Sequence, residues 1–87
     1  MKVIEKESSY WPGYEYIIVE AIEEEYIRII VDGYKELFYY VPKDFRQRFF
    51  VSKSNYFKVG DNISLSWLIY NFCDCFKPFR CIRHERN

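Results

Sequence analysis

The segment Glu25–Val41 (EYIRIIVDGYKELFYYV) constrains the fold of this chain more strongly than any other stretch. Two runs rich in Ile, Val, Tyr and Phe flank the dipeptide Asp32-Gly33, a pattern typical of two β-strands joined by a tight turn. We expect a β-hairpin with a three-residue loop over Val31–Gly33, in which Gly33 takes the left-handed backbone conformation that such a loop requires. The remaining segments are expected to add strands to this pair.

The three-residue loop also decides which side chains of the hairpin share a face. It places Arg28 opposite Glu36 on one face. The apolar side chains collect on the other face: Ile27, Ile29, Leu37 and Tyr39. A two-residue loop would instead set Glu36 against Ile29. We prefer the three-residue loop because facing opposite charges contribute about 0.2–1 kcal/mol, whereas a carboxylate on an apolar face costs more.

Length and composition favour one small, mainly β domain. Nineteen of the 87 residues are Phe, Tyr or Trp, and each can bury about 150–250 Å² in a core. The chain has one Ala and no Thr, and good helix formers are scarce, which favours a sheet over a helix bundle. We expect an N-terminal arm over residues 1–13 and a single domain over residues 14–87.

The net charge is zero, but the two halves of the chain differ in sign. Residues 1–42 hold nine acidic and four basic residues, and residues 43–87 hold nine basic and four acidic ones. A neutral chain gives no general support for nucleic-acid binding, although the second half can form a local basic face. No apolar run approaches the ~18 residues of a membrane span, and the N-terminus lacks the apolar core of a secretory signal. We therefore expect a cytoplasmic protein with reduced thiols.

Further strands are expected on both sides of the hairpin. Tyr14–Ile22 predicts a strand with apolar side chains on both faces. In Ile63–Ile69, apolar and polar residues alternate with the period of two that a strand with one buried face shows. Phe79–His84 predicts a last short strand, and Met1–Ser9 either adds an edge strand or is mobile.

The connector Pro42–Phe50 separates the first three strands from the last two. Pro42 suits a helix start, and Phe45, Phe49 and Phe50 can share one face of a short helix. A strand would instead place Phe45 and Phe49 on one face with Val51, and we prefer the helix. The order of elements predicts a mainly β fold, a small five- to six-stranded antiparallel barrel with one short helix between strands 3 and 4. The barrel is expected to be OB-like (the oligonucleotide-binding fold), with an SH3-like barrel as the alternative.

One segment carries a family resemblance. Phe57–Leu65 (FKVGDNISL) resembles the K-V-G-D-x-I/V segment that opens the fourth strand of S1-like OB domains. The glycines typical of the first two strands of that family are absent, and Glu25 and Arg28 stand where small or apolar residues are usual. No RNA-binding residue of the family is therefore carried over to this chain.

Three cysteines and the one histidine form the most pointed chemical pattern: Cys73, Cys75, Cys81 and His84. Tetrahedral zinc accepts these ligands, but structural sites usually space paired cysteines as C-x₂₋₄-C. A C-x-C pair in an extended chain sends its two sulfurs to opposite faces. We expect free thiols and no cofactor, with a small zinc-binding module as an alternative. No Ser/His/Asp arrangement or phosphate-binding glycine loop is present, and we expect no enzymatic activity.

Two surfaces are candidates for binding. Residues on the charged face of the hairpin form an aromatic, interface-like patch: Tyr26, Phe38, Tyr40, Arg28 and Glu36. Basic residues interleaved with aromatics suggest a single-stranded DNA or RNA groove as the alternative: Lys43, Arg46, Arg48, Lys53, Tyr56 and Lys58.

We expect the chain to bind another protein through the aromatic patch, either a different protein or a second copy in a homodimer. The Ile-, Lys-, Asn- and Tyr-rich composition with one Ala is typical of an AT-rich genome. A phage or mobile-element protein that modulates a host factor would fit that composition.

Overall fold

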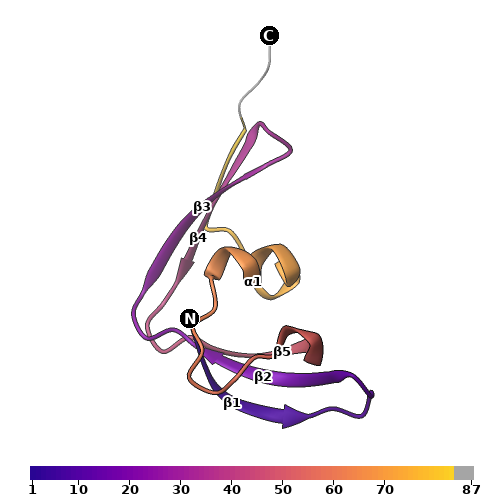
Figure 1. Cartoon of the computed structure of the whole chain (residues 1–87). Coiled ribbons are helices and arrows are strands. Elements are labelled where there is room, and N and C mark those ends of the chain that lie inside the picture. The colour runs from indigo at the N-terminus through magenta and orange to yellow at the C-terminus, as the bar shows by residue number, and fades with distance from the viewer. Residues whose placement is uncertain (84–87) are drawn as a thin grey trace.

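The computed structural model describes residues 1–83, apart from the side chains of residues 81 and 83. In this part of the chain, six strands form two three-stranded antiparallel sheets (Figure 1). Sheet A has the order β1 (Lys2–Ser8), β2 (Tyr14–Glu20) and β5 (Arg46–Ser52). Sheet B has the order β3 (Glu25–Val31), β4 (Lys35–Val41) and β6 (Arg80–Arg83). The helical elements are η1 (Lys53–Asn55), α1 (Leu65–Asn71) and η2 (Cys73–Cys75).

The expected closed barrel, OB-like or SH3-like, is wrong. Among the described residues the strands divide between two separate sheets, and no strand of sheet A pairs with a strand of sheet B. The one α-helix follows β5 and does not lie between strands 3 and 4. Figure 1 shows α1 between sheet A and the β3–β4 hairpin, where it supplies the third layer of the core. A sandwich-like arrangement of two sheets and a helix therefore replaces the barrel.

The connector expected to be a short helix is instead a strand. Arg46–Ser52 forms β5 and pairs with β2 along its whole length. Phe49 and Val51 are buried on the inner face of sheet A, while Arg46 and Arg48 lie on the outer face. The period of two that a strand needs was present here, and pairing with β2 outweighed the helical spacing of the phenylalanines.

The expected strand in Ile63–Ile69 is wrong, because Leu65–Asn71 forms the helix α1. In α1, Leu65, Leu68 and Ile69 are buried, at the i, i+3 and i+4 spacing of one helical face. Leu65 and Ile69 fit both a strand and a helix, so Leu68 is the residue that distinguishes the two patterns. The helix begins after Ser64, whose backbone is extended (φ −63°, ψ 132°).

The hairpin forms with the expected faces but a different register. Ile29 faces Leu37 and Arg28 faces Phe38, so the pairing is shifted by two residues from the predicted one. Gly33 is left-handed as expected (φ 74°), and Asp32 is left-handed too (φ 57°), so the loop contains Asp32–Tyr34. Because a shift of two keeps every side chain on its face, the expected apolar face is confirmed.

The N-terminal segment and the strand that follows it lie in sheet A. Residues 2–8 form β1, the edge strand that was one of the two alternatives, and Val3 in it is fully buried. The expected strand Tyr14–Ile22 is confirmed as β2, the central strand. Residues 80–83 of the expected last strand form β6, whereas His84 lies outside the described residues.

One hydrophobic core joins the two sheets and the helix. Its largest fully buried side chains come from all three layers: Val3, Ile17, Val19, Val41, Phe49 and Leu68. The hairpin extends beyond this core, and the molecule measures 50 × 27 × 16 Å with a radius of gyration of 14.7 Å. A compact domain of this length would have a radius of gyration of ~12 Å. Within the described residues, no helix combines the length and apolar character needed to cross a bilayer.

Candidate protein interface on sheet B

The five residues predicted to form a protein interface lie on one face of sheet B, turned away from α1. The register of β3 and β4 sets Tyr26 against Tyr40, Arg28 against Phe38, and Ile30 against Glu36. We call this surface the outer aromatic face, and its residues are Tyr26, Arg28, Ile30, Glu36, Phe38 and Tyr40. The prediction placed these residues on one face correctly because the face of a side chain depends only on whether the register shifts by an odd or an even number of residues. The shift here is two, so every side chain keeps its face.

Two tyrosines form one end of the outer aromatic face. Tyr26 is 67% exposed, and its ring centroid lies 4.9 Å from that of Tyr40. The Tyr40 hydroxyl donates a hydrogen bond of 3.1 Å to Oε2 of Glu24 in the β2–β3 turn. This hydrogen bond, with smaller effects from burial and from the Glu24 charge, raises the pKa of Tyr40 above its usual value. Tyr40 is thereby held in position, while most of Tyr26 remains accessible to solvent.

Residues that the sequence analysis missed extend the face across β4. Phe79 is 59% exposed, and its ring centroid lies 6.3 Å from that of Phe38. The Phe79 backbone N–H donates to the Phe38 carbonyl (2.8 Å), and the Arg80 guanidinium lies 6.0 Å from the Phe38 ring centroid. The sequence predicted a strand over residues 79–84, of which residues 80–83 form β6, but it contained no signal that this strand pairs with β4.

An ion pair crosses the middle of the face. Nη1 of Arg28 lies 3.5 Å from Oε1 of Glu36, a diagonal contact because Arg28 directly faces Phe38. The Arg28 side chain is 60% exposed and the Glu36 side chain 17% exposed. Because the Arg28 side chain of this pair is open to solvent, the pair contributes ~0.2–1 kcal/mol and orients the two side chains more than it stabilises the fold. The guanidinium retains donors for a further carboxylate.

Two recesses meet at Tyr26. A groove of about 260 Å³ is lined by Tyr26, Ile27, Arg28, Phe38, Tyr39 and Phe79. A wider recess of about 690 Å³ is lined by Ile22, Glu23, Glu24, Tyr26 and Lys43. Pockets for drug-sized ligands usually measure ~300–1,000 Å³ and are largely enclosed. The groove is smaller than this and suits a side chain of another protein.

The residues predicted for a nucleic-acid groove do not form one surface. Arg46 and Arg48 lie on the outer face of sheet A, 3.5 Å from Glu5 and 3.4 Å from Glu7 respectively. The Arg48 guanidinium also lies 4.3 Å from the centroid of the Tyr16 ring. These ion pairs neutralise the basic charge of β5. Lys43 lines the recess beside Glu23 and Glu24 instead.

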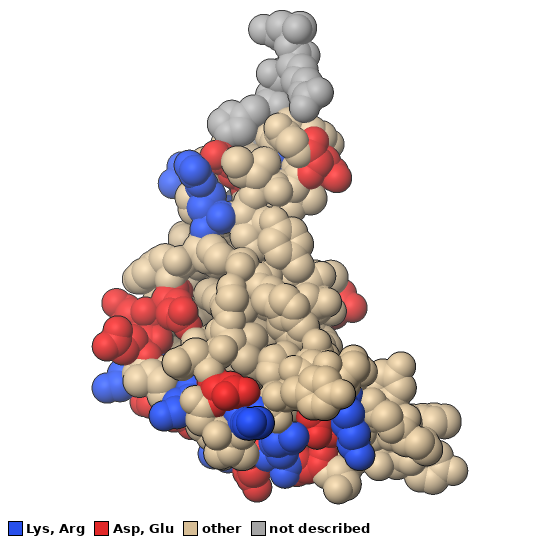
Figure 2. All heavy atoms as spheres, viewed as in Figure 1, with Lys and Arg blue, Asp and Glu red and all other residues tan. Residues whose placement is uncertain are grey.

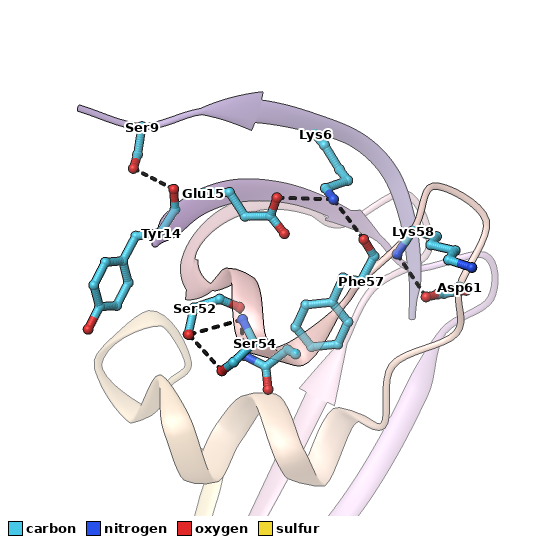
Figure 3. Close-up of polar contacts among 10 residues, drawn as sticks. Lys6, Ser9, Tyr14, Glu15, Ser52, Ser54, Phe57, Lys58 and Asp61 are labelled. Carbon is cyan, nitrogen blue, oxygen red and sulfur yellow. Dashed lines mark hydrogen bonds and ion pairs between the residues drawn. The ribbon is translucent and has the colours of Figure 1, made fainter. Parts of the chain in front are cut away.

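The other basic residues of that prediction, Lys53 and Lys58, line a pocket between sheet A and the loop after β5. Figure 3 shows Lys6, Glu15, Phe57 and Lys58 of this pocket. The pocket measures about 320 Å³, and its lining residues are Lys6, Glu15, Lys53, Tyr56, Phe57 and Lys58. Nζ of Lys6 lies 3.0 Å from Oε1 of Glu15 and donates a hydrogen bond of 2.8 Å to the Phe57 carbonyl. Glu15 is only 7% exposed, so this pair, which the sequence analysis missed, fixes the loop to sheet A.

The predicted zinc ligands are only partly described. Cys73 and Cys75 are exposed free thiols in η2, while the Cys81 side chain and His84 lie outside the described residues. Among the residues that are described, no group of three or more His, Cys, Asp or Glu side chains is placed to hold a metal ion.

No family model, curated protein or solved structure matches this chain. The resemblance of residues 57–65 to S1-like OB domains therefore stays a prediction from sequence. In the structure residues 57–64 are a loop with a turn at Val59-Gly60, in which the Lys58 backbone N–H donates to Oδ2 of Asp61 (2.8 Å; Figure 3), and Leu65 begins α1.

Proposed function

We propose that this protein is a non-catalytic module that binds another protein through the outer aromatic face. The observation that carries the proposal is the exposure of Tyr26 (67%) and Phe79 (59%) on either side of one groove. Aromatic side chains that leave this much apolar surface in contact with water are typical of protein interfaces, where Tyr is a frequent anchor of binding energy.

The charges around the face support a partner that approaches in one orientation. Glu23 and Glu24 line the recess at the Tyr26 end, whereas Arg28 and Arg80 lie beside Phe38. Figure 2 shows an acidic group at the base of the hairpin and a basic group nearer its tip, which has acidic side chains beside it. Charge separated in this way affects the orientation and rate of encounter more than the final affinity.

A site-specific cross-linking experiment tests the proposal. A photo-activatable phenylalanine analogue replaces Tyr26 in one variant and Tyr70 in another, and each is irradiated in lysate of the organism that encodes the chain. Tyr70 lies on α1 and is 66% exposed, so it is a control matched in residue type and exposure. We expect a discrete cross-linked protein from the Tyr26 position alone. The same products from both positions, or none from Tyr26, would contradict the proposal.

Single-stranded nucleic acid is a second candidate ligand, favoured by one observation. Tyr56 is 80% exposed beside Lys53 and Lys58, so that a base could stack on its ring while the lysines approach phosphates. Titration of labelled oligonucleotides at low salt tests this candidate. Binding that weakens steeply with salt and is lost in Tyr56→Ala would support it, and no binding at 50 mM salt would exclude it.

A further inference from the structure

The edge of sheet B at β3 is open for pairing with another chain. In the part of the chain that the structure describes, every backbone hydrogen bond of β3 runs to β4 or closes the turn between them. In an antiparallel strand, alternate residues point their N–H and C=O groups to opposite sides. One side of β3 therefore presents a row of backbone donors and acceptors that a further strand can pair with.

The other edges carry the features that discourage such pairing. On β1, the pairing with β2 is irregular between Val3 and Glu5, and the Val3 backbone is hydrogen-bonded to Gly60 and Asp61. The β5 edge matches β3 in length and in its unbroken register, but on its outer face Arg46 and Arg48 are held in ion pairs and Phe50 stacks on Tyr14. In the described part of the chain, β6 has four residues. The β3 edge has seven residues, pairs with β4 in an unbroken register, and leaves Tyr26 and Ile30 exposed on its outer face.

The side chains of β3 suit an added strand on both faces. Tyr26 (67% exposed) and Ile30 (52% exposed) are apolar surfaces on the outer aromatic face. On the inner face, Ile27 and Val31 are half-buried and would be covered by the side chains of a neighbouring strand. Arg28, between Tyr26 and Ile30, is the one charged residue in the interior of the strand.

The position of Arg28 argues against a second copy of this chain as the occupant. Antiparallel self-pairing that uses all seven residues of β3 sets Tyr26 against Ile30 and Arg28 against Arg28 of the other copy. Like charges directly opposite each other destabilise a strand pair. The ion pair of Arg28 with Glu36 of its own hairpin (3.5 Å) offsets part of this repulsion, but it leaves guanidinium donors free. A carboxylate opposite Arg28 would bind those donors and add a favourable cross-strand pair.

We propose that β3 binds an extended segment of a different protein by strand addition, with an acidic residue opposite Arg28. On the same face, the residues two positions before and after that acidic residue are apolar and contact Tyr26 and Ile30. The recognised pattern is apolar–x–acidic–x–apolar, in a segment that contributes main-chain hydrogen bonds for affinity and alternate side chains for specificity. This proposal rests on the proposed function and specifies how the partner is held.

Synthetic peptides test strand addition directly. The probe is the capped nine-residue peptide Val-Thr-Val-Thr-Glu-Thr-Val-Thr-Val, which places Val two positions before and after the central Glu, and its twin carries Lys in place of Glu. Binding is followed by chemical-shift changes and amide hydrogen exchange of the ¹⁵N-labelled protein. We expect slower exchange of amides within Glu25–Val31 on addition of the Glu peptide, and binding about fivefold weaker for the Lys peptide. In the variant Arg28→Glu, shown to be folded by circular dichroism, the preference should reverse.

The outcomes separate this proposal from the proposed function. Peptide binding that leaves β3 exchange unchanged, or is indifferent to the central charge in both proteins, would overturn strand addition. Absence of binding by either peptide would also overturn it. If, without peptide, the amides of β3 exchange more slowly as the protein concentration rises, a second copy of the chain is the occupant instead. If strand addition fails but the Tyr26 cross-link is still obtained, only the mode of binding is wrong.

Discussion

At the scale of single residues, exposure decides what each aromatic side chain contributes. Phe49 is 1% exposed, and its ring centroid lies 4.9 Å from that of Phe72 and 6.0 Å from that of Phe76. Phe50, the next residue, points to the other face of sheet A, is 39% exposed and stacks on Tyr14 at 5.1 Å. Two phenylalanines adjacent in sequence therefore have different environments.

Replacing these phenylalanines should give unequal losses of stability. Phe49→Ala removes a ring from the centre of the core and is expected to lower the free energy of unfolding by about 3–5 kcal/mol. Phe50→Ala removes a partly exposed ring and should cost about 0.5–1.5 kcal/mol. Urea unfolding followed by tryptophan fluorescence measures both. Similar losses for the two variants would contradict the placement of β5 in sheet A.

The hydrogen bond from Tyr40 to Glu24 predicts a titration that one substitution changes. Because this hydrogen bond raises the pKa of Tyr40 in the folded state, its contribution to stability is present below the unfolded-state pKa and is lost as pH rises through the folded-state value. Glu24→Gln should move the pKa of Tyr40 back toward 10.0, as measured by NMR titration of the ring. The pKa of Tyr39 is raised mainly by burial and should stay raised in Glu24→Gln. Equal changes at both tyrosines would contradict the assigned cause.

At the scale of elements, the hairpin was predictable because its information is local. Alternation along β3 and β4 and the Asp32-Gly33 turn are contained in seventeen adjacent residues, and they determine which side chains share a face. The exact register was not predictable, because it depends on where the three-residue loop begins: the loop contains Asp32–Tyr34 and not Val31–Gly33, with Asp32 left-handed as well as Gly33. The residues of the outer aromatic face were placed on one face for the same reason, and Phe79 was missed because its place depends on long-range pairing.

The turn itself can be tested by substitution at its two left-handed positions. Gly33→Ala places a Cβ where φ is 74° and should destabilise the protein by about 1–2 kcal/mol. Asp32→Asn should be neutral or slightly stabilising, because Asn tolerates the left-handed conformation and Asn-Gly is preferred when both central residues have φ above zero. Thermal unfolding of the two variants measures the difference. A loss in Asp32→Asn as large as that in Gly33→Ala would contradict this account.

The helix α1 shows why a short apolar segment can be assigned wrongly. Leu65 and Ile69 satisfy both a period of two and a helical spacing, so the alternation alone could not decide. The decision depends on which surface the rest of the fold offers. In the space between sheet A and the hairpin, a helix buries Leu68 together with Leu65 and Ile69.

Leu68 and Tyr70 distinguish the two structures experimentally. In a strand they would share a face, whereas in α1 Leu68 is fully buried and Tyr70 is 66% exposed. Leu68→Ala should therefore lower the free energy of unfolding by about 2–5 kcal/mol, and Tyr70→Ala by about 0.5 kcal/mol or less. Chemical denaturation measures both values. Comparable losses would favour the strand.

At the scale of the whole molecule, the division into two sheets leaves much of the hairpin outside the core. A barrel would enclose both ends of β3 and β4, but here the distal half of the hairpin projects beyond α1 (Figure 1).

Small-angle X-ray scattering should give a radius of gyration near the 14.7 Å of the Cα atoms, allowing for hydration, whereas a compact domain would give ~12 Å. The value should stay constant across a concentration series, because Arg28 disfavours pairing between copies at the β3 edge. A compact value would contradict the projecting hairpin, and a rise with concentration would indicate self-association. The same projection that costs the molecule core contacts keeps the outer aromatic face and the β3 edge accessible together, so one partner can engage both.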